Sequence, residues 1–505
     1  MVHSTKIVSL LFLAAGLTYS CSQQDDIISN DTPNEVTPTE VTKGNIKVVF
    51  RMQSNPSAPT TRSAEDSYVH TQGTPEEYKV NSARVYLFDS PTKLLVKSFL
   101  LSNLTNIGSD ADGNVVYETE NVMVPQGTYD VFVTANTNRI INKDHEDDFL
   151  ADIDSITYTR AQIEDISNGI FMTNRASANV STVITEDEKG EISVVYVELE
   201  RTLARLDVAK SAEEYALTDK NGTQYASVKL DGFYIVNLPK YFYTFRHCAV
   251  LTSLEEPTWS LSTNFGKVSD VNGYVIDPYF FKKKVDASSF TNQDKYYENF
   301  FCDITTPSVV KWMSFNAVSQ TPNYKTTYSL ENCTLAPAQK NGYSTGVLFR
   351  AVMEPYNNVY HLNGSTLELI NNKQNYPEVL YYYGYRFFDS PEALNFYASG
   401  NSSQTDPKVF EAKKFEKSND GNYHCYYKYW IRHLDNNKPT VMGVMEFGIV
   451  RNNLYRMLVT NVSDLGDGDP ELIPNNDTPD EGETKLKVIL NVKPWIVRDL
   501  TNIVL

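Results

Sequence analysis

Two segments near opposite ends of the chain carry the same alternation of apolar and polar side chains. Residues 46–53 read IKVVFRMQ and residues 486–493 read LKVILNVK, and apolar residues occupy every second position. Alternation with period two predicts a β-strand with one buried face. Both segments depart from the alternation at the same step, at Val49 and at Ile489. Any two amphipathic strands look somewhat alike, but a close match also fits a chain in which one strand can take the place of another.

Strand patterns dominate the first part of the chain as well. Apolar runs at residues 80–88, 94–101, 115–124 and 128–136 are separated by turns rich in Asp, Gly, Asn and Pro. Short runs of this kind, punctuated about every ten residues, are typical of an all-β sandwich. Helical periodicity is confined to short pieces such as residues 158–166. The pattern therefore predicts an all-β protein with a few short helices.

The same pass along the chain suggests two domains and a tail. A charged break at residues 186–190 precedes a strand, after which a long second region begins. We expect an N-terminal β-sandwich domain over residues 63–198 and a C-terminal β-sandwich domain over residues 199–483. Residues 484–505 then form a separate C-terminal strand segment.

Residues 1–21 have the features of an export signal. Lys6 precedes an apolar run at residues 7–17, which is too short to span a bilayer and has the length of a signal-peptide core. Cys21 follows a small residue, as in the lipobox of bacterial lipoproteins, so we expect it to be acylated, for example with palmitate. The alternative is an ordinary signal peptide with an unrelated cysteine. Residues 22–43 are acidic and have little to bury, which predicts a disordered tether.

Composition narrows the classes of partner and of compartment. The chain has 505 residues and a net charge of −18, which argues against binding to nucleic acid and against adsorption to anionic lipid. Four cysteines follow Cys21 without any C-x-x-C spacing, so neither a zinc site nor a dense disulfide framework is indicated. One or two disulfides remain open in an envelope protein, and the sequence does not choose among the three pairings of these cysteines: Cys248, Cys302, Cys333 and Cys425.

The sequence contains no recognisable catalytic motif. The seven histidines are scattered, and neither HExxH, GxSxG nor a phosphate-binding glycine loop is present. Residues 144–148 (DHEDD) include metal-ligating types, but adjacent side chains of a charged run mostly face solvent. His424 and Cys425 are neighbours that would point to opposite faces of a strand, so they do not form a dyad. We therefore expect no enzymatic activity, no metal and no cofactor.

Four segments, in this order, resemble the Bacteroidales fimbrillin family, which comprises the subunits of type V pili. The resemblance covers roughly residues 1–140, 195–210 and 445–505, and the middle of the second domain shows no counterpart. The first segment is the early strand, followed by the TTRS sequence at 60–63 and the strand at 80–88. The second is GTYDVFVTAN at 127–136, and the third is RTLARL at 201–206. The fourth is IVRNNLYR at 449–456, followed by the Gly- and Asp-rich loop at 464–469 and the final strands around 492–497.

The resemblance implies two transthyretin-like β-sandwich domains and a lipoprotein precursor bound to the outer membrane by its lipid. In the family, an arginine-specific protease cuts the loop behind the first strand. The matching position is Arg62, so that Ser63 becomes the new N-terminus of a cell-surface fimbrium subunit. Other copies of the chain or related fimbrial subunits are then the expected partners, and receptors on host or bacterial surfaces are candidates for adhesion. A plain loop arginine is the alternative reading of Arg62.

Cleavage at Arg62 would remove residues 44–62, which comprise the displaced strand (residues 46–53) and the cleavage loop, together with everything before them, and would open a groove in the sandwich. A donor strand from another subunit would fill this groove, with Trp495 as a further anchor after the break at Pro494. Because one donor and one groove per subunit do not close on themselves, the product is a filament, and we expect a stalk subunit; tip and anchor roles stay open. The inward side chains of the displaced strand are Ile46, Val48, Phe50 and Met52, and those of the donor strand are Leu486, Val488, Leu490 and Val492.

A surface lipoprotein that binds glycans is the alternative function. Aromatic clusters at residues 381–385 and 423–430 could stack on sugars. Alternating aromatic residues in strands more often belong to a core or a sheet face, so the fimbrial reading is preferred.

Overall fold

Strands make up most of the described chain, which confirms the all-β fold class. The computed structural model has five short helical segments in its described part: α1 (Pro75–Tyr78), α2 (Glu146–Leu150), α3 (Arg160–Glu164), η3 (Lys373–Asn375) and α7 (Pro391–Ala398). None of its described helices is long and apolar enough to cross a membrane. The structure describes residues 43–52, 74–109, 115–154, 158–174, 180–184, 192–250, 273–280, 300–302, 310–333, 342–400, 412–433, 443, 446–470 and 485–494.

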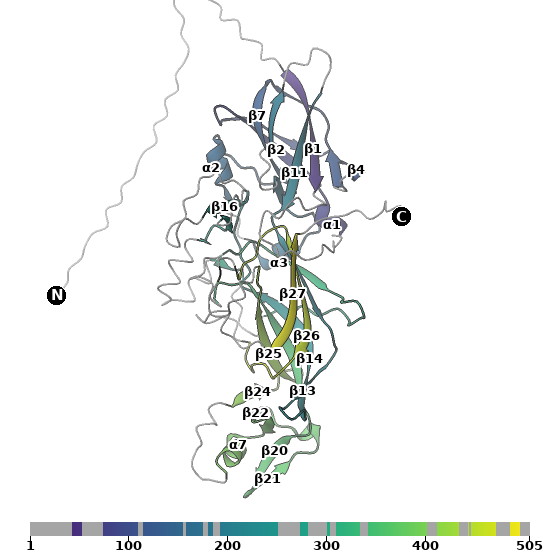
Figure 1. Ribbon diagram of the computed structural model, residues 1–505, viewed down its shortest axis with the longest axis vertical. Helices are drawn as coiled ribbons and strands as arrows, with labels where there is room; N and C mark the ends of the chain where they lie inside the picture. Colours follow the sequence, from purple (N-terminus) through teal and green to yellow (C-terminus); the bar gives the residue numbers. More distant parts are fainter. Residues whose placement is uncertain are drawn as a thin grey trace, which may run out of the picture. The chain divides into compact units, whose positions relative to one another are not determined.

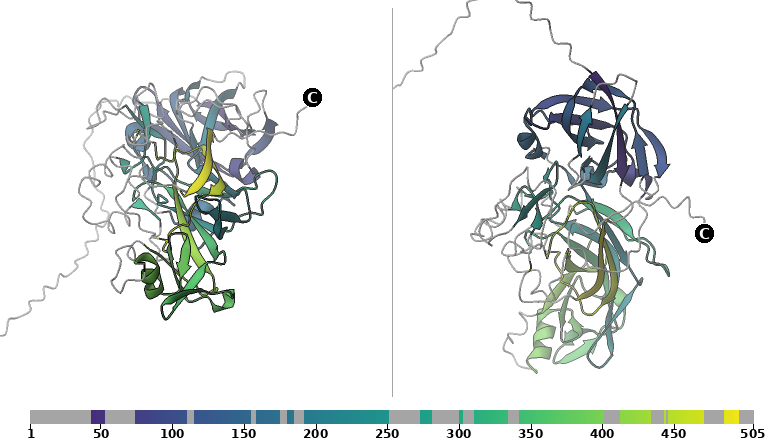
Figure 2. Two further views of the ribbon diagram at one scale, coloured as in Figure 1. Left: turned by 60° about the horizontal axis from the view of Figure 1, so that its bottom comes forward. Right: turned by 45° about the horizontal axis from the view of Figure 1, so that its top comes forward.

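The first part of the described chain forms a ten-stranded, strongly curved sheet (Figures 1 and 2). Its strand order is β3-β2-β7-β9-β11-β1-β5-β4, while β10 pairs with β7 and β6 pairs with β1. The strands are β1 (Lys43–Met52), β2 (Ala83–Asp89), β3 (Leu95–Leu101), β4 (Thr105–Ser109), β5 (Val115–Glu118), β6 (Val122–Pro125), β7 (Gly127–Ala135), β9 (Met172–Asn174), β10 (Val180–Ile184) and β11 (Ile192–Arg201).

Strand β2 is buried on both of its faces, which explains its continuous apolar sequence. Val85 and Leu87 point into the main core, whereas Tyr86 and Phe88 join a second cluster with Phe149 of α2. The Phe149 ring lies 4.7 Å from the ring centroid of Tyr86 and 4.9 Å from that of Phe88. Helix α2 therefore covers the outer side of this part of the sheet.

The single strand expected at residues 115–124 is in fact two strands, β5 and β6, and this expectation was wrong. Both pair with β1, but the ladder is interrupted between them at residues 119–121. Here the side chain of Thr119 replaces a backbone acceptor, because its hydroxyl accepts a hydrogen bond from the Val48 amide at 3.1 Å. The apolar run alone contained no signal that a side-chain hydroxyl takes the place of a backbone acceptor.

The later part of the chain contains two four-stranded sheets that share one apolar core (Figure 1). Their orders are β18-β12-β26-β27 and β13-β14-β19-β25. Inward residues of both, such as Val208, Met457, Leu230 and Phe349, belong to the same cluster, as in the two layers of a sandwich. The strands are β12 (Ala204–Lys210), β13 (Tyr215–Thr218), β14 (Gln224–Val236), β18 (Lys325–Ser329), β19 (Gly346–Pro355), β25 (Tyr423–Trp430), β26 (Asn453–Val462) and β27 (Leu486–Pro494).

A third sheet is inserted in the sequence between β19 and β25, and its order is β21-β20-β23-β22-β24. Helix α7 packs on it through Ala393 and Leu394. The aromatic run at residues 381–388, whose sequence alone favours a single strand, is a hairpin that turns at Gly384 and Tyr385. The strands of this sheet are β20 (Val359–Asn363), β21 (Thr366–Leu369), β22 (Val379–Tyr383), β23 (Arg386–Phe388) and β24 (Lys413–Glu416).

Two short pairings complete the described strands. β8 (Ile153–Asp154) pairs with β15 (Phe242–Tyr243), and β16 (His247–Val250) pairs with β17 (Gly273–Ile276). The β8–β15 pair joins segments that are about ninety residues apart in the chain, so it ties the two parts of the described structure together.

Candidate functional site

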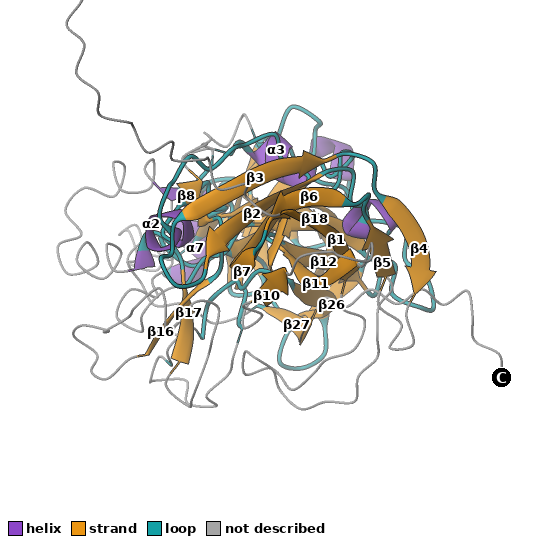
Figure 3. Cartoon of the chain, turned by 90° about the horizontal axis from the view of Figure 1, so that it is seen from above, coloured by secondary structure: helices purple, strands orange, loops and turns teal. Residues whose placement is uncertain are grey.

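The first strand of the described chain, β1, is an interior strand of the ten-stranded sheet (Figure 3). It runs parallel to β11, in register from Asn45 opposite Ile192 to Met52 opposite Leu199. On its other side it is antiparallel to β5 and β6. Both backbone edges of β1 are therefore hydrogen-bonded to neighbouring strands.

The inward face of β1 fills the centre of the core. Ile46, Val48, Phe50 and Met52 are all at most 1% exposed, and Phe50 is one of the largest fully buried side chains of the described structure. Together they belong to the main apolar cluster. Loss of this strand would remove four side chains from the core at once.

The outward face of β1 carries two charged contacts and one buried apolar residue. Lys47 Nζ lies 2.6 Å from Glu118 Oε2 on β5, and both side chains are about one-third exposed. The Arg51 guanidinium stacks over the Tyr196 ring of β11 at 4.1 Å from its centroid. Val49 lies between these two positions and is only 3% exposed. The departure from alternation at Val49 is thus a buried outward residue opposite Tyr196.

Among the described strands β27 is the last; it lies at the edge of its sheet and has β26 as its one partner there. Its register places Leu486 opposite Val462 and Pro494 opposite Asn453. Leu486 is buried, Val488 is half-buried and Lys487 is exposed. The structure gives the backbone positions of Leu490 and Val492, whose side chains lie outside the described part, and Trp495 lies outside it entirely.

The proposed processing residues cannot be placed. Cys21, Arg62 and Ser63 all lie outside the described residues. The structure does describe the element that directly follows the Arg62 segment, helix α1, and its anchorage is unusually polar.

Glu77 of α1 is fully buried and forms an ionic network with the second part of the chain. Both of its carboxylate oxygens accept hydrogen bonds from Arg205 Nη1, at 3.0 and 2.9 Å. Tyr328 Oη donates to Glu77 Oε1 at 2.8 Å, and Arg201 Nε donates to the Glu77 carbonyl at 2.6 Å. Arg205 is paired as well with Asp207. This network holds the end of the chain that would become the N-terminal segment after a cut at Arg62.

The acidic run at residues 144–148 is a helix start. His145 Nδ1 accepts from the Asp147 amide at 3.3 Å as the cap of α2. Glu146 is buried beside Lys93 and Asp130. Burial, reinforced by the charge of Asp130, raises the pKa of Glu146 to about 7, against the opposing effect of Lys93. Among the described residues no group of three or more His, Cys, Asp or Glu side chains could hold a metal ion.

The four later cysteines are buried thiols in the structure. Burial raises the pKa of Cys248 to about 12 and that of Cys425 to about 11, so both thiols stay protonated. His424 bonds to Asp420 at 2.9 Å rather than to its neighbour Cys425. These cysteines act as small apolar side chains of the core.

Sequence reasoning did not identify the partners of β1. Glu118, Thr119 and Tyr196 contact it from β5, the following turn and β11. No local pattern marks them, because their role depends on which strands pair.

The glycine-rich loop at 464–469 was noted only as a motif. A side chain at Gly468 would meet the Lys414 carbonyl, and one at Gly466 the Tyr426 carbonyl, so the loop passes very close to two strands.

Two family descriptions match this chain. Residues 46–205 match "Major fimbrial subunit protein (FimA)", and residues 421–501 match "Major fimbrial subunit protein type IV, Fimbrillin, C-terminal". The first match begins within β1 and the second ends beyond β27, so most of β1 and all of β27 fall inside the matched regions. These matches identify the class of protein as a fimbrial subunit. More narrowly, both matched descriptions are of fimbrillins, so the resemblance to the Bacteroidales fimbrillin family that the sequence motifs indicated is confirmed.

Solved structures of similar proteins are distant in sequence. A fimbrilin of Porphyromonas gingivalis W83 is 14% identical, with a TM-score of 0.39, and the match covers 90% of this chain and 99% of that one. The tip fimbrial protein of Porphyromonas gingivalis, with a C-terminal truncation, is 12% identical, with a TM-score of 0.33, and covers 89% and 100%. Comparison with curated proteins finds no match.

Proposed function

We propose that this fimbrillin is a stalk subunit that polymerises by strand exchange. It is exported as a lipoprotein acylated at Cys21 and held at the outer membrane. An arginine-specific protease then cuts between Arg62 and Ser63, which releases the lipid together with β1. The mature subunit consists of two β-sandwich domains, residues 63–198 and 199–483, and a donor segment, residues 484–505. It is incorporated into a cell-surface fimbrium that supports adhesion.

The observation that carries this proposal is the position of β1 between two partners. Removal of an edge strand leaves a sheet with a new edge, whereas removal of an interior strand leaves a slot with backbone donors and acceptors on both sides. Here the slot is bordered by β11 and by β5 with β6. An incoming strand therefore gains hydrogen bonds along both of its edges.

The donor strand matches the slot position by position. When Leu486 takes the place of Ile46, Val488 takes that of Val48, and Leu490 and Val492 follow at the sites of Phe50 and Met52. Four apolar side chains of this kind contribute on the order of 6–12 kcal/mol when buried. In the same register Ile489 replaces Val49 against Tyr196, which accounts for the shared departure from alternation.

The polar face of the donor supports the same register. Lys487 falls at the position of Lys47 and can take over the ion pair with Glu118. Asn491 falls at the position of Arg51 and gives up the stacking contact with Tyr196. One of the two charged contacts, the ion pair with Glu118, is thus kept in this register.

The subunit has both parts that a stalk requires. A removable first strand allows it to accept a neighbour, and a terminal edge strand allows it to donate to one. β27 pairs with its own sheet along one edge only, so it can be withdrawn without disturbing an interior ladder. An anchor subunit would keep its lipid, and a tip subunit would not need both parts.

Mass spectrometry of the N-terminus of surface fimbriae tests the proposal directly. We expect a chain that begins at Ser63. A chain that begins at acylated Cys21 would assign an anchor instead. Deletion of residues 484–505 should leave a folded, cleavable protein that forms no long filaments, and long filaments from this truncation would refute the donor assignment.

A further inference from the structure

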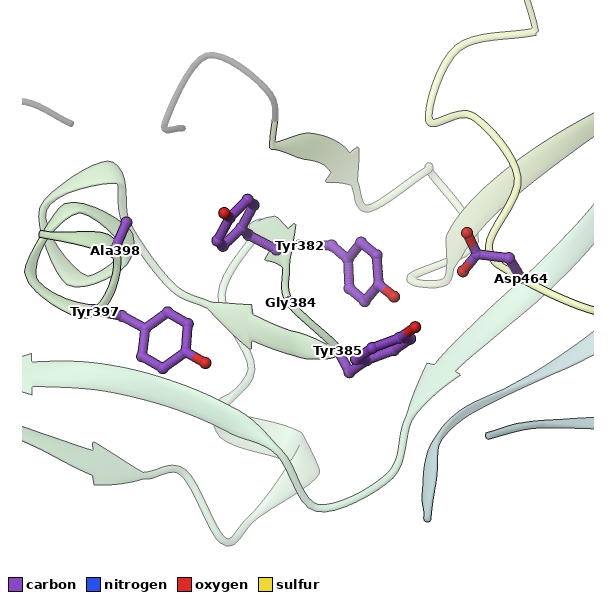
Figure 4. Close-up of a pocket in the computed structure, with 7 residues that line it drawn as sticks. Tyr382, Gly384, Tyr385, Tyr397, Ala398 and Asp464 are labelled. Atoms are coloured by element: carbon purple, nitrogen blue, oxygen red, sulfur yellow. The ribbon is translucent and has the colours of Figure 1, made fainter. Parts of the chain in front are cut away.

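A pocket lies where the inserted sheet meets the loop that follows β26 (Figure 4). Its volume is about 700 Å³, within the range of about 300–1,000 Å³ that is usual for small-ligand sites. The β22–β23 turn, helix α7 and the loop at 464–469 contribute its walls. In Figure 4 the rings of Tyr382 and Tyr385 are directed toward Asp464, and Tyr397 reaches from α7 toward Gly384.

The turn that forms one wall is strained at its tip. Gly384 has φ +58° and Tyr385 has φ +64°, so both central residues of this two-residue turn are left-handed. Such turns favour Asn and Gly, and an aromatic residue in this conformation is strained. Tyr385 nevertheless stands there, with its side chain 42% exposed at the mouth of the pocket. Strain of this kind is typical of a position selected for contact rather than for folding.

The polar end of the pocket is built rigidly. Asp464 Oδ1 accepts hydrogen bonds from Tyr225 Oη at 2.6 Å and from the Leu465 amide at 2.8 Å. Burial raises the pKa of the Tyr225 phenol, and burial does the same for Tyr382, so both hydroxyls stay protonated. The tyrosine rings behind this end are stacked, with 5.7 Å between the centroids of Tyr225 and Tyr382. The close backbone contacts of Gly466 and Gly468 fix the loop that carries the carboxylate.

The charges around the pocket select against ionic ligands. Arg386 lies over the Tyr397 ring at 4.8 Å from its centroid, so a cation bound against these rings would meet a positive charge. Asp464 lines the opposite part of the pocket, and its charge is offset by Lys413 and Lys485 nearby, so this part favours neither an anion nor a cation. The ligand that suits these rings and charges is therefore a neutral one with flat apolar faces and several hydroxyl groups.

We propose that this pocket binds a neutral saccharide. The sugar ring stacks its apolar face on Tyr385, and its hydroxyls donate to the Asp464 carboxylate and bond to the Tyr382 hydroxyl. The site gives the subunit a receptor-binding activity separate from polymerisation, because it shares no residue with the β1 slot or with β27. It also gives a role to the inserted sheet, which the strand-exchange proposal does not use.

The test uses the full chain carrying Arg62→Ala, which stays uncut, so that the outcome does not depend on assembly. A printed array of neutral and charged oligosaccharides identifies the best glycan, and calorimetry with that glycan measures the Kd. We expect a neutral glycan with a Kd of about 1 mM or tighter. Tyr385→Asn should weaken binding at least about tenfold without lowering the Tm, because Asn tolerates the left-handed turn. Asp464→Asn should weaken binding as well.

The matched control is Tyr356→Ala, which removes an exposed tyrosine of the same region that does not line the pocket and should bind like the parent. Three results would overturn the proposal: no neutral glycan bound at about 10 mM, binding confined to sialylated glycans or to choline, or unchanged affinity in Tyr385→Asn. None of these results bears on cleavage or strand exchange, which are tested separately.

Discussion

Reversal of one charge on the donor strand tests the register proposed for strand exchange. In the precursor, Lys47 of β1 pairs with Glu118 of β5 at 2.6 Å. After exchange, the aligned Lys487 of a neighbouring subunit should pair with the same carboxylate. Lys487→Glu leaves the precursor pair intact, and Lys487 is exposed in its own sheet, so folding and cleavage should be unaffected.

The expected effect follows from the exposure of the pair. The Lys47 and Glu118 side chains are 28% and 33% exposed, so the attraction is that of a partly screened ion pair, about 0.5–1 kcal/mol. Replacement of the donor lysine by glutamate removes this attraction and adds a repulsion of similar size. The total, about 1–2 kcal/mol, corresponds to roughly five- to thirtyfold faster loss of the donor strand.

The assay is the rate at which purified filaments dissociate into subunits in detergent at fixed temperature. Lys487→Glu should dissociate faster than the parent, and the double variant Glu118→Lys with Lys487→Glu should recover most of the difference. Lys220→Glu, which places the same change on an exposed turn, is the control. If the double variant were no more durable than Glu118→Lys alone, the donor would occupy the slot in another register.

Three further predictions concern the same molecule. Glu77→Gln breaks the buried pair with Arg205 and should lower the free energy of unfolding of both precursor and mature protein by about 3 kcal/mol in chemical denaturation. The control Glu213→Gln breaks a surface pair with Lys210 and should change this free energy by less than about 0.5 kcal/mol. Glu146 has a folded pKa of about 7, above its ordinary value of 4.5, so the folded state holds an extra proton between these values and stability should fall as the pH rises from 4.5 to 7. Glu146→Gln should flatten that part of the curve of unfolding free energy against pH, and an unchanged slope would contradict the assignment. Arg62→Ala should leave the precursor folded and abolish ladders in detergent gels, and ladders from this variant would show that cleavage is not required.

Much of the fold was predictable where one face of a strand is buried. The alternation at residues 46–53 predicted a strand and the side chains that face the core, and β1 has this form. β2, β3 and β7 lie where their apolar runs predicted them. The prediction of one strand at residues 115–124 was wrong, because the hydrogen bond from the Val48 amide to the Thr119 hydroxyl depends on a strand far away in the sequence. Periodicity measures burial, and it contains no information about which partner satisfies an interrupted ladder.

The inserted sheet was predicted even less well from the periodicity of its sequence. Its strands are short, and its central hairpin turns at Gly384-Tyr385, where a tyrosine occupies a position at which turn rules expect Asn or Gly. The aromatic run was therefore read as one strand. The second aromatic cluster, at residues 423–430, lies in β25, where Tyr423 and Tyr427 belong to the core. The first cluster lines the pocket described above, and what distinguishes the two clusters is tertiary placement rather than composition.

If the chain is cut at Arg62 as proposed, the role of the cut follows from effective concentration. While β1 is tethered through the segment that contains Arg62, it competes for the slot as an intramolecular ligand at about millimolar effective concentration. A donor strand at micromolar concentration is then at a disadvantage of roughly a thousandfold, about 4 kcal/mol, even if its contacts are equally good. Cleavage removes this advantage without changing a single contact in the slot. The donor therefore does not need to fit better than β1; it needs to fit about as well, which is the relationship that the two matched sequences have.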